Sequence, residues 1–304
     1  MQLVESHIIK PTDSRYAAID AACFASKNLY NAALYEMRQA FIFQHIRLSY
    51  PKMDKLMKFH EAYKALPARV AQQVLKLLEK NWKSYFRACD AYWKDPSTFL
   101  GHPNLPKYKD KVKGRNILIY TAQAVSKTAL KKAIVKPSQL DIEIVSICPE
   151  VDQVRIVSRK GFYVVEVIYE QGCELEPVNP DLYAGIDLGI NNLATLTSNK
   201  SGFVPRIVNG RPVKSINQFY NKRRADLQSK LAQMDAKRHT SNRLERITNK
   251  RIRKIDHYLH TASRRIIDVL VSEGIGTLVI GYNAEWKQEV HIGKRNNQNF
   301  VNIP

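Results

Sequence analysis

The stretch Ala184-Gly185-Ile186-Asp187-Leu188-Gly189-Ile190-Asn191-Asn192 decides the fold of this 304-residue chain. It places an aspartate within an apolar strand, and burial of such a charge is costly unless the carboxylate is paired or binds a metal. The glycine two residues later, Gly189, allows the backbone or a ligand to approach closely. An aspartate that only caps a turn at the end of a strand would have the same local sequence. The rest of the chain therefore has to decide between a functional aspartate and a turn-capping one.

Two functional classes carry a D-x-G sequence on a first strand. Nucleases and integrases of the ribonuclease H type use the aspartate to hold catalytic Mg²⁺, whereas actin-like and sugar-kinase ATPases use a similar strand to bind phosphates. The ATPases usually have Thr or Ser after the glycine and need a second D-x-G-x-G strand much later; this chain has Ile190-Asn191-Asn192 and no second motif. Their motif also generally opens the domain, whereas about 180 residues precede it here. The nuclease interpretation is favoured, and an actin-like ATPase stays as a distant alternative.

The residues around this strand predict a sheet with a long helical insertion. Tyr183–Ile190, Leu193–Ser198 and Phe203–Val208 are closely spaced and favour an antiparallel meander. The span 213–273 has no Gly or Pro and repeats apolar residues at helical spacing. It predicts two long helices that break near residues 239–242, where small polar side chains can cap the second. Leu278–Gly281 is then expected to form a fourth, buried strand.

Much of the positive charge lies in this helical span. Residues 222–265 contain 14 Lys and Arg against four Asp and Glu, which is about half of the net charge of +20 in about one seventh of the length. A solvated helical hairpin normally mixes the two signs, so the excess favours a surface that follows a phosphate backbone. His257 and His260 have no cluster of carboxylates or cysteines nearby and are interpreted as ordinary helix residues. The expected nucleic-acid contacts are Lys222, Arg223, Arg224, Arg251, Arg253 and Lys254.

The N-terminal half predicts a helical lobe followed by strands. Residues 14–95 have helical periodicity, and one of the helices carries a basic stripe opposite its apolar face. A basic stripe is usually a solvated helix face, but few acids neutralise this one, so a nucleic-acid contact is as good an interpretation here as a solvated surface. Residues 96–114 predict an ordered loop or hinge. The short alternating stretches after it predict a small β-barrel or sheet, with a hairpin turn at Arg159-Lys160-Gly161. A domain boundary is expected at 170–181. The stripe residues expected to bind nucleic acid are Lys76, Lys80, Lys83 and Arg87.

The composition excludes several classes of protein. Lys and Arg number 48 against 28 Asp and Glu, and such an excess usually serves a polyanionic partner, most often nucleic acid. No run of ~20 apolar residues is present, so no membrane span is expected, and the first residues lack the order of a signal peptide. The four cysteines form no C-x-x-C pair, which gives no basis for a zinc site and fits a reducing cytoplasm.

Five stretches carry a resemblance to a known family: residues 26–31 (SKNLYN), 81–85 (NWKSY), 105–111 (LPKYKDK), 185–189 (GIDLG) and 219–223 (FYNKR). In them the chain closely resembles the TnpB (OrfB) proteins of bacterial insertion sequences, long called transposases and similar to the RNA-guided nucleases from which type V CRISPR effectors descend. In chain order they look like the family's YN helix (often described as a helix-turn-helix), its recognition-lobe helix and following loop, its first RuvC strand, and the start of its bridging helical region. The resemblance covers essentially the whole chain.

This resemblance implies an α/β fold in three parts. They are a helical recognition lobe at 14–114, a β-barrel wedge from 1–13 and 115–175, and an incomplete ribonuclease H-like (RuvC) domain at 182–304 with a basic insertion at 213–273. It also implies a transposon-encoded, RNA-guided and Mg²⁺-dependent DNA endonuclease acting in transposition, with a guide RNA and double-stranded DNA as partners, located in the bacterial cytoplasm at the nucleoid. Asp187 would then be the catalytic carboxylate and Mg²⁺ ligand.

Two departures from the family pattern concern its catalytic site. Gly281 stands where the second RuvC glutamate is usual, and relatives with a G-Y-N-x-x-W-K-Q variant supply a glutamate from further along, which makes Glu285 and then Glu289 the candidates. The chain also stops at Pro304, before the family's helix, four-cysteine zinc ribbon and last RuvC aspartate. It is therefore expected to be a truncated reading frame or a fragment. The alternative function is a nucleic-acid-binding remnant without catalysis.

Overall fold

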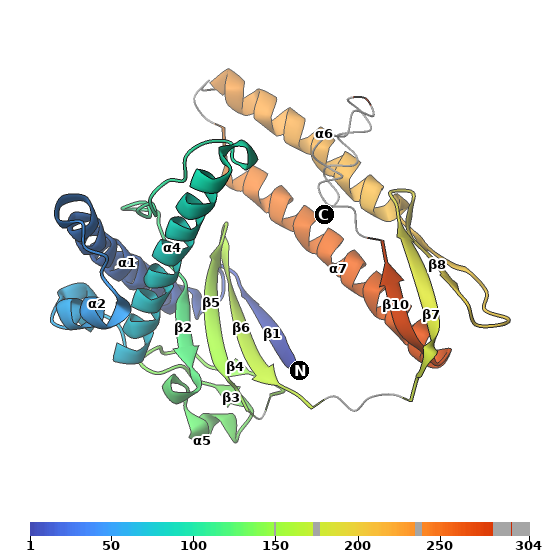
Figure 1. Ribbon diagram of the computed structural model, residues 1–304, viewed down its shortest axis with the longest axis horizontal. Coiled ribbons are helices and arrows are strands. Elements are labelled where there is room, and N and C mark those ends of the chain that lie inside the picture. The colour runs from blue at the N-terminus through green and yellow to red at the C-terminus, as the bar shows by residue number, and fades with distance from the viewer. Residues whose placement is uncertain (149, 173–176, 235–238, 282–292, 294–304) are drawn as a thin grey trace. The chain divides into compact units, whose positions relative to one another are not determined.

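The computed structural model describes residues 1–148, 150–172, 177–234, 239–281 and 293. The chain divides into two compact units, Met1–Cys173 and Glu174–Pro304 (Figure 1). Both units combine helices with sheets, so the predicted α/β class is confirmed. No helix in these described ranges is both long and apolar enough to cross a membrane.

Four helices follow the first strand of the first unit, as the periodicity of residues 14–95 predicts. Their apolar stripes are buried, with Ile19 and Leu78 wholly covered. The first helix ends where His45 takes a left-handed backbone conformation (φ 56°) and the Ile46 amide donates to the Ala40 carbonyl at 2.9 Å. Such a cap usually employs glycine. The helices are α1 (Tyr16–Gln44), α2 (Tyr50–Met57), α3 (Glu61–Lys64) and α4 (Ala68–Lys94).

The strands of the first unit form an open sheet. Four of them pair antiparallel in the order β1-β6-β5-β2, and two short ones, β3 and β4, pair separately. The predicted hairpin at 159–161 is confirmed, with Gly161 at φ 81°. The expected barrel is wrong for the described chain, because β1 and β2 stand at the two ends of the sheet. The elements are β1 (Gln2–Ile9), η1 (Pro96–Thr98), β2 (Leu118–Thr121), η2 (Ala122–Ala124), α5 (Lys127–Leu130), β3 (Ile134–Val135), β4 (Ile144–Val145), β5 (Gln153–Arg159) and β6 (Phe162–Glu170).

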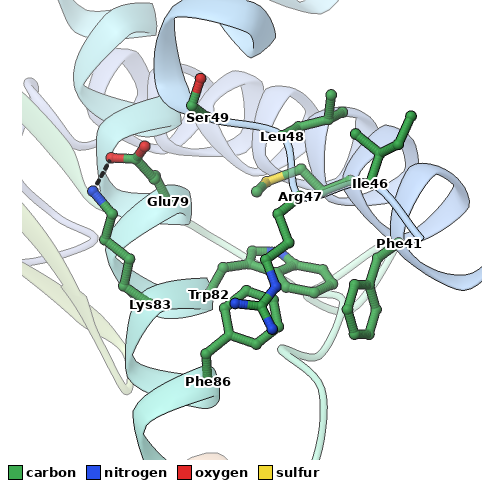
Figure 2. A pocket seen from close by; sticks show the side chains of 10 residues that line it. Phe41, Ile46, Arg47, Leu48, Ser49, Glu79, Trp82, Lys83 and Phe86 are labelled. Atoms are coloured by element: carbon green, nitrogen blue, oxygen red, sulfur yellow. Dashed lines mark hydrogen bonds and ion pairs between the residues drawn. The ribbon is translucent and has the colours of Figure 1, made fainter. Parts of the chain in front are cut away.

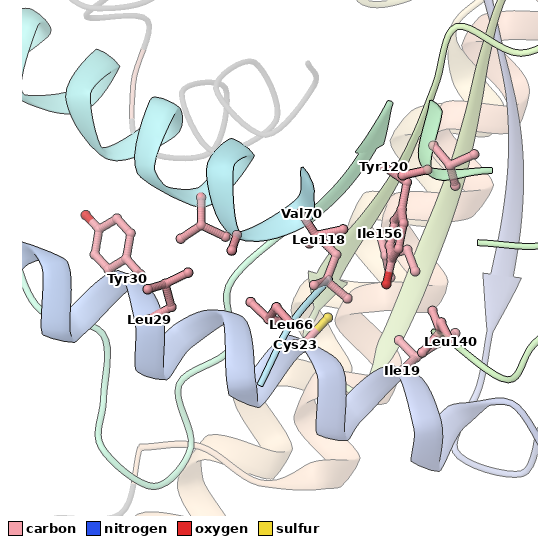
Figure 3. Packing of buried hydrophobic residues seen from close by; sticks show 14 of the residues in the cluster. Ile19, Cys23, Leu29, Tyr30, Leu66, Val70, Leu118, Tyr120, Leu140 and Ile156 are labelled. Atoms are coloured by element: carbon pink, nitrogen blue, oxygen red, sulfur yellow. The ribbon is translucent and has the colours of Figure 1, made fainter. Parts of the chain in front are cut away.

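One hydrophobic core joins the helices of this unit to its sheet. Figure 3 shows side chains of α1 and α4 meeting those of β2 and β5, among them Cys23, Val70, Leu118 and Ile156. Each of these four is fully buried, and burial of an apolar side chain of this size stabilises the fold by ~1.5–3 kcal/mol. The helical lobe and the sheet are therefore held by the same packing.

The second unit contains a four-stranded sheet in the order β10-β7-β8-β9. The predicted meander is confirmed, since β7, β8 and β9 pair antiparallel in sequence. The fourth strand, β10, lies parallel to β7, but the expectation that it is buried is wrong: Val279 and Ile280 are 55% and 53% exposed. The strands are β7 (Asn179–Leu188), β8 (Asn192–Ser198), β9 (Arg206–Asn209) and β10 (Ile275–Ile280).

Two long helices connect β9 to β10, as predicted from the span without Gly or Pro. They are α6 (Arg211–Met234) and α7 (Asn242–Ser272). The hydroxyl of Ser241 accepts a hydrogen bond from the Leu244 amide at 3.2 Å, which caps the start of α7 where small polar residues were expected to do so. Leu270 of α7 packs against Ala184 and Ile186 of β7, so the helix covers one face of the sheet.

Candidate nucleic-acid interface

Asp187 lies near the carboxyl end of β7, on the sheet face opposite the one that α7 covers. Its neighbour Ile186 is buried and belongs to the core under α7, whereas Asp187 itself is exposed and pairs across the sheet with Thr195 of β8. The expectation of a buried aspartate is therefore wrong. Because alternate residues of a strand face opposite sides, an apolar sequence around an acid does not bury that acid when one face of the sheet is open.

The turn after Asp187 requires glycine for a structural reason. A Cβ on Gly189 would lie 2.7 Å from the Asn192 carbonyl oxygen, and one on Gly210 would lie 2.0 Å from that of Ile190. The Gly210 amide donates to the Asn191 carbonyl at 2.7 Å, next to the start of α6. The close approach predicted at Gly189 is thus between two backbone segments. The sequence analysis did not single out Gly210, although a glycine directly before a helix can indicate such a close backbone contact.

The position beside Asp187 holds no acid. Ile280 of β10 pairs with Ile186, so continuing the parallel register by one residue brings Gly281 next to Asp187. In the part of the chain that the structure describes, no three His, Cys, Asp or Glu side chains gather as a metal site would require. Glu285 and Glu289 lie outside the described residues. The described residues therefore do not by themselves fit the group of carboxylates that a two-metal Mg²⁺ site needs.

The helices α6 and α7 are joined by polar contacts as well as apolar ones. The Arg251 guanidinium donates through Nε to Oδ1 of buried Asn217 at 2.5 Å and lies over the Tyr220 ring, 5.2 Å from its centroid. The Tyr220 hydroxyl lies 3.0 Å from Oγ1 of Thr248. Arg251, predicted from sequence as a phosphate contact, is half-buried and holds the two helices together.

A groove of about 510 Å³ lies between these helices. Phe219 is 71% exposed at its edge, and the exposed Arg223 of α6 and Lys250 and Lys254 of α7 also line it. Among the described residues no carboxylate forms an ion pair with these three cations. Cations beside an exposed aromatic ring can bind a phosphate backbone and stack on a base. Sequence reasoning gave Phe219 no binding role, although a large exposed aromatic residue in a basic helix is a usable signal.

The other predicted cations of this hairpin are also at the surface. Lys222 and Arg224 of α6 are exposed. Arg253 of α7 is exposed, and its Nε donates to the Asn249 carbonyl at 3.3 Å. Two further cations are offset within their own helices by acids four residues away, in the pairs Lys230–Asp226 and Arg264–Asp268. Within the described residues these two pairs offset only a small part of the excess positive charge of the hairpin.

The basic stripe on α4 is exposed along its length, at Lys76, Lys80, Lys83 and Arg87. Lys83 pairs with Glu79 at 2.9 Å, and Lys76 Nζ lies 5.1 Å from the centroid of the Tyr50 ring. Burial tends to raise the pKa of Glu79, but hydrogen bonds from Lys83 and the Tyr50 amide outweigh it and hold that pKa below its usual value. Lys80 and Arg87 thus keep the least compensated charge of the stripe.

The stretches 26–31 and 105–111 bind each other. Both lie in the first unit, 26–31 within unbroken α1 and 105–111 in the loop before β2. The buried Lys27 donates through Nζ to the Lys111 carbonyl at 2.7 Å. The Asn31 side chain exchanges two hydrogen bonds of 2.9 Å with the backbone of Lys109. These motif residues therefore anchor the loop on α1.

The family comparison concerns mainly the second unit. Residues 163–287, which include β7 to β10 and both long helices, match the OrfB family of IS605, described as "Probable transposase". No curated protein matches the chain.

Two solved structures are similar to this chain. One, from the cryo-EM structure of a Cas12f1–sgRNA–target DNA complex, is 14% identical with a TM-score of 0.51, over 89% of this chain and 65% of that one. The other, from the cryo-EM structure of a CRISPR-Cas12f ternary complex, is 12% identical with a TM-score of 0.32, over 90% and 64%. The chain spans about two thirds of the length of both. The first likeness concerns the fold, while the match over residues 163–287 confirms the resemblance of this chain to the OrfB transposases of insertion sequences.

Proposed function

We propose that this chain is a transposon-encoded protein of the RNA-guided nuclease kind that binds a structured guide RNA and double-stranded DNA. The observation that carries the proposal is the groove between α6 and α7, where Arg223, Lys250 and Lys254 stand around the exposed ring of Phe219. Backbone phosphates would pair with the cations and position the nucleic acid, while carrying no sequence information. The groove lies within the residues that match the transposase family.

Cleavage of DNA is the finer part of this proposal and rests on the resemblance. Asp187 would be the first carboxylate of the catalytic site and a ligand of Mg²⁺, and Glu285 or Glu289 the candidates for the second. The described residues do not complete such a site, so we assign no cleavage step to them. The presence of Gly281 beside Asp187 favours a second candidate function, a nucleic-acid-binding protein that does not cut by itself.

The experiment that tests binding measures the affinity of residues 1–304 for structured RNA and for duplex DNA as the salt concentration rises. Contacts to 6–10 phosphates predict a loss of ~10³–10⁵ in affinity between ~50 and ~200 mM salt. A double charge reversal, Arg223→Glu with Lys254→Glu, should weaken binding to all sequences and lower the salt slope by ~2.

The matched control removes two positive charges elsewhere, at exposed Lys132 and Lys131 of the first unit. Their reversal to Glu changes the net charge equally and should have a much smaller effect. An equal effect of the two double variants would mean that only the total charge matters and would refute the assignment of the groove. Binding without salt dependence would refute the nucleic-acid function.

A further inference from the structure

The second unit has another concave site, beside the outer strand of its sheet. It is a pocket of about 360 Å³ between β9 and α7, and it is lined by other residues than the groove between α6 and α7. Its lining is largely apolar and includes Leu196 and Ile266, but exposed Arg206 of β9 and exposed Arg265 of α7 also line it. Leu196 belongs to the core under α7, so the pocket lies on the side of the sheet opposite to that of Asp187.

The two arginines of this pocket carry charge that no described acid neutralises by direct pairing. Neither guanidinium forms an ion pair within the ranges that the structure describes. The carboxylate of Glu273 lies in the field of Arg206, but Lys200 Nζ already pairs with it at 2.7 Å. Both guanidinium groups can therefore take an anionic ligand without first giving up a carboxylate.

The cavity beside α4 in the first unit differs in this respect. It has a volume of about 260 Å³, and two cations line it (Figure 2). Lys83 pairs with Glu79 at 2.9 Å, and the guanidinium of Arg47 lies 4.0 Å from the centroid of the Phe86 ring. Both of these cations are engaged by their neighbours, which favours the pocket between β9 and α7 as the anion site.

One face of α7 lines both concave sites of the second unit. Lys250 and Lys254 line the groove with α6, whereas Tyr258, Thr261 and Arg265 line the pocket with β9. These positions recur every three or four residues, which is the repeat of one helix face. At ~1.5 Å per residue, Arg265 follows Lys254 by ~16 Å along the helix, a distance that about five nucleotides of a stacked strand would span.

We propose that Arg206 and Arg265 form a second phosphate-binding site that anchors the nucleic-acid backbone on the α7 side of the sheet; this deepens the proposed function and rests on it. A guanidinium group fits a phosphate through two parallel hydrogen bonds, and the apolar lining strengthens the attraction because it lowers the local dielectric. The Tyr258 hydroxyl donates to the Asn209 carbonyl, which joins α7 to the end of β9 and holds the pocket in shape before a ligand binds. The site positions the nucleic acid and takes no part in cutting.

The test measures the affinity of the unaltered chain and of single variants for structured RNA and for duplex DNA. Arg206→Gln and Arg265→Gln should each lower the affinity by up to about eightfold at ~0.1 M salt, because one phosphate contact contributes a salt slope of about −0.9. Arg264→Gln is the matched control. It removes the same charge from the neighbouring exposed residue, which pairs with Asp268 at 2.8 Å, and it should change the affinity much less.

A double variant, Arg206→Gln with Arg265→Gln, tests whether the two arginines share one phosphate. It should lose less affinity than the product of the two single losses, because both guanidinium groups hold the same ligand. Losses that multiply in full, or equal effects of Arg265→Gln and Arg264→Gln, would overturn this site while leaving the proposed function intact. Failure of the unaltered chain to bind either nucleic acid at low salt would overturn the proposed function instead. The substituted positions are exposed, so the variants should stay folded.

Discussion

Ile280 of β10 pairs with Ile186 of β7 as the last pair of the parallel ladder. Continuing this register by one residue places Gly281 next to Asp187. Neighbouring strands are ~4.8 Å apart, a separation at which two carboxylates can share a cation. A glycine in this place supplies no such carboxylate, so among the described residues Asp187 has no second acid on the neighbouring strand. Whether the strand ends can bind a cation therefore depends on the residues at positions 187 and 281 together, and not on the D-x-G sequence of β7 alone.

We predict that residues 1–304 bind nucleic acid but do not cut it. Among the described residues no second acid joins Asp187, and a single carboxylate cannot hold two Mg²⁺ ions ~3.5–4 Å apart or orient the attacking water. The measurement is cleavage of a supercoiled target plasmid with Mg²⁺ and a cognate guide RNA. Guide-dependent cutting that disappears in Asp187→Ala and in Glu285→Gln or Glu289→Gln would contradict the prediction and identify the second acid.

Gly281→Glu should create a cation site that the described residues of the unaltered chain do not form. A Cβ on Gly281 meets no atom within 4 Å, so the substitution fits sterically. We expect millimolar Mg²⁺ to raise the melting temperature of Gly281→Glu and not that of the original chain, because a ligand that binds only the folded state stabilises it. The same change in an Asp187→Ala background is the control and should show no Mg²⁺ effect. Stabilisation that persists there would place the cation elsewhere.

Gly210→Ala should destabilise the second unit, whereas Gly185→Ala should not. The new methyl at 210 would lie 2.0 Å from a backbone oxygen of Ile190, while at 185 nothing lies within 4 Å. Overpacking of this kind costs ~1–3 kcal/mol or more, against ~0.5 kcal/mol for a neutral surface change. Chemical denaturation of both variants measures the difference. Similar stabilities would mean that the turn and the start of α6 separate easily.

Asn31→Ala should loosen the loop that precedes β2. It removes the two hydrogen bonds of 2.9 Å to the Lys109 backbone and leaves an amide and a carbonyl of the loop without these partners, at a cost of ~1–3 kcal/mol. Asn28→Ala, an exposed position one turn earlier, is the matched control and should be near neutral. Limited proteolysis should cut between residues 96 and 114 faster in Asn31→Ala only. Equal protection in the two variants would refute an anchoring role.

Acid should destabilise the first unit partly through Asp20. Two hydrogen bonds from Arg115, of 2.8 and 2.7 Å, lower the pKa of this carboxyl below its ordinary 3.8; burial opposes this, and the Tyr163 hydroxyl adds to it. A carboxyl with a lowered pKa contributes stability above its unfolded-state pKa, and this is lost as the pH falls through the folded-state value. The melting temperature of Asp20→Asn should therefore be below that of the original chain at pH 7, and the gap should close under acid. Asp181→Asn, at an exposed site of the second unit, should show no such gap.

The sequence predicted the helices and strands better than it predicted which of their residues are exposed. The meander after Tyr183 and the two helices on either side of Ser241 follow from local periodicity and capping, which are read within a dozen residues. The exposure of Asp187 and of Val279 depends on which face and which edge of the sheet are covered, and no local pattern encodes that.

The same limit applies to the candidate sites. The cations of the helical hairpin were predicted because charge is visible in composition, whereas the packing role of Arg251 and the pocket between β9 and α7 arise from residues distant in sequence. The contact between Asn31 and Lys109 spans 78 residues, and only the fold shows why both motifs are present. The open sheet could not be told from a barrel, because both give the same alternation along each strand.

The single core shared by α1, α4, β2 and β5 has a consequence for how such a chain can be recombined. A crossover between the helices and the sheet would remove the side chains that bury Leu118 in one product and Val70 in the other. Residues 1–173 therefore have to be exchanged or engineered as one segment. Chimaeras that exchange the whole segment should stay soluble, and those joined near residue 114 should aggregate. In this sense the smallest modular part of the first unit is the entire unit.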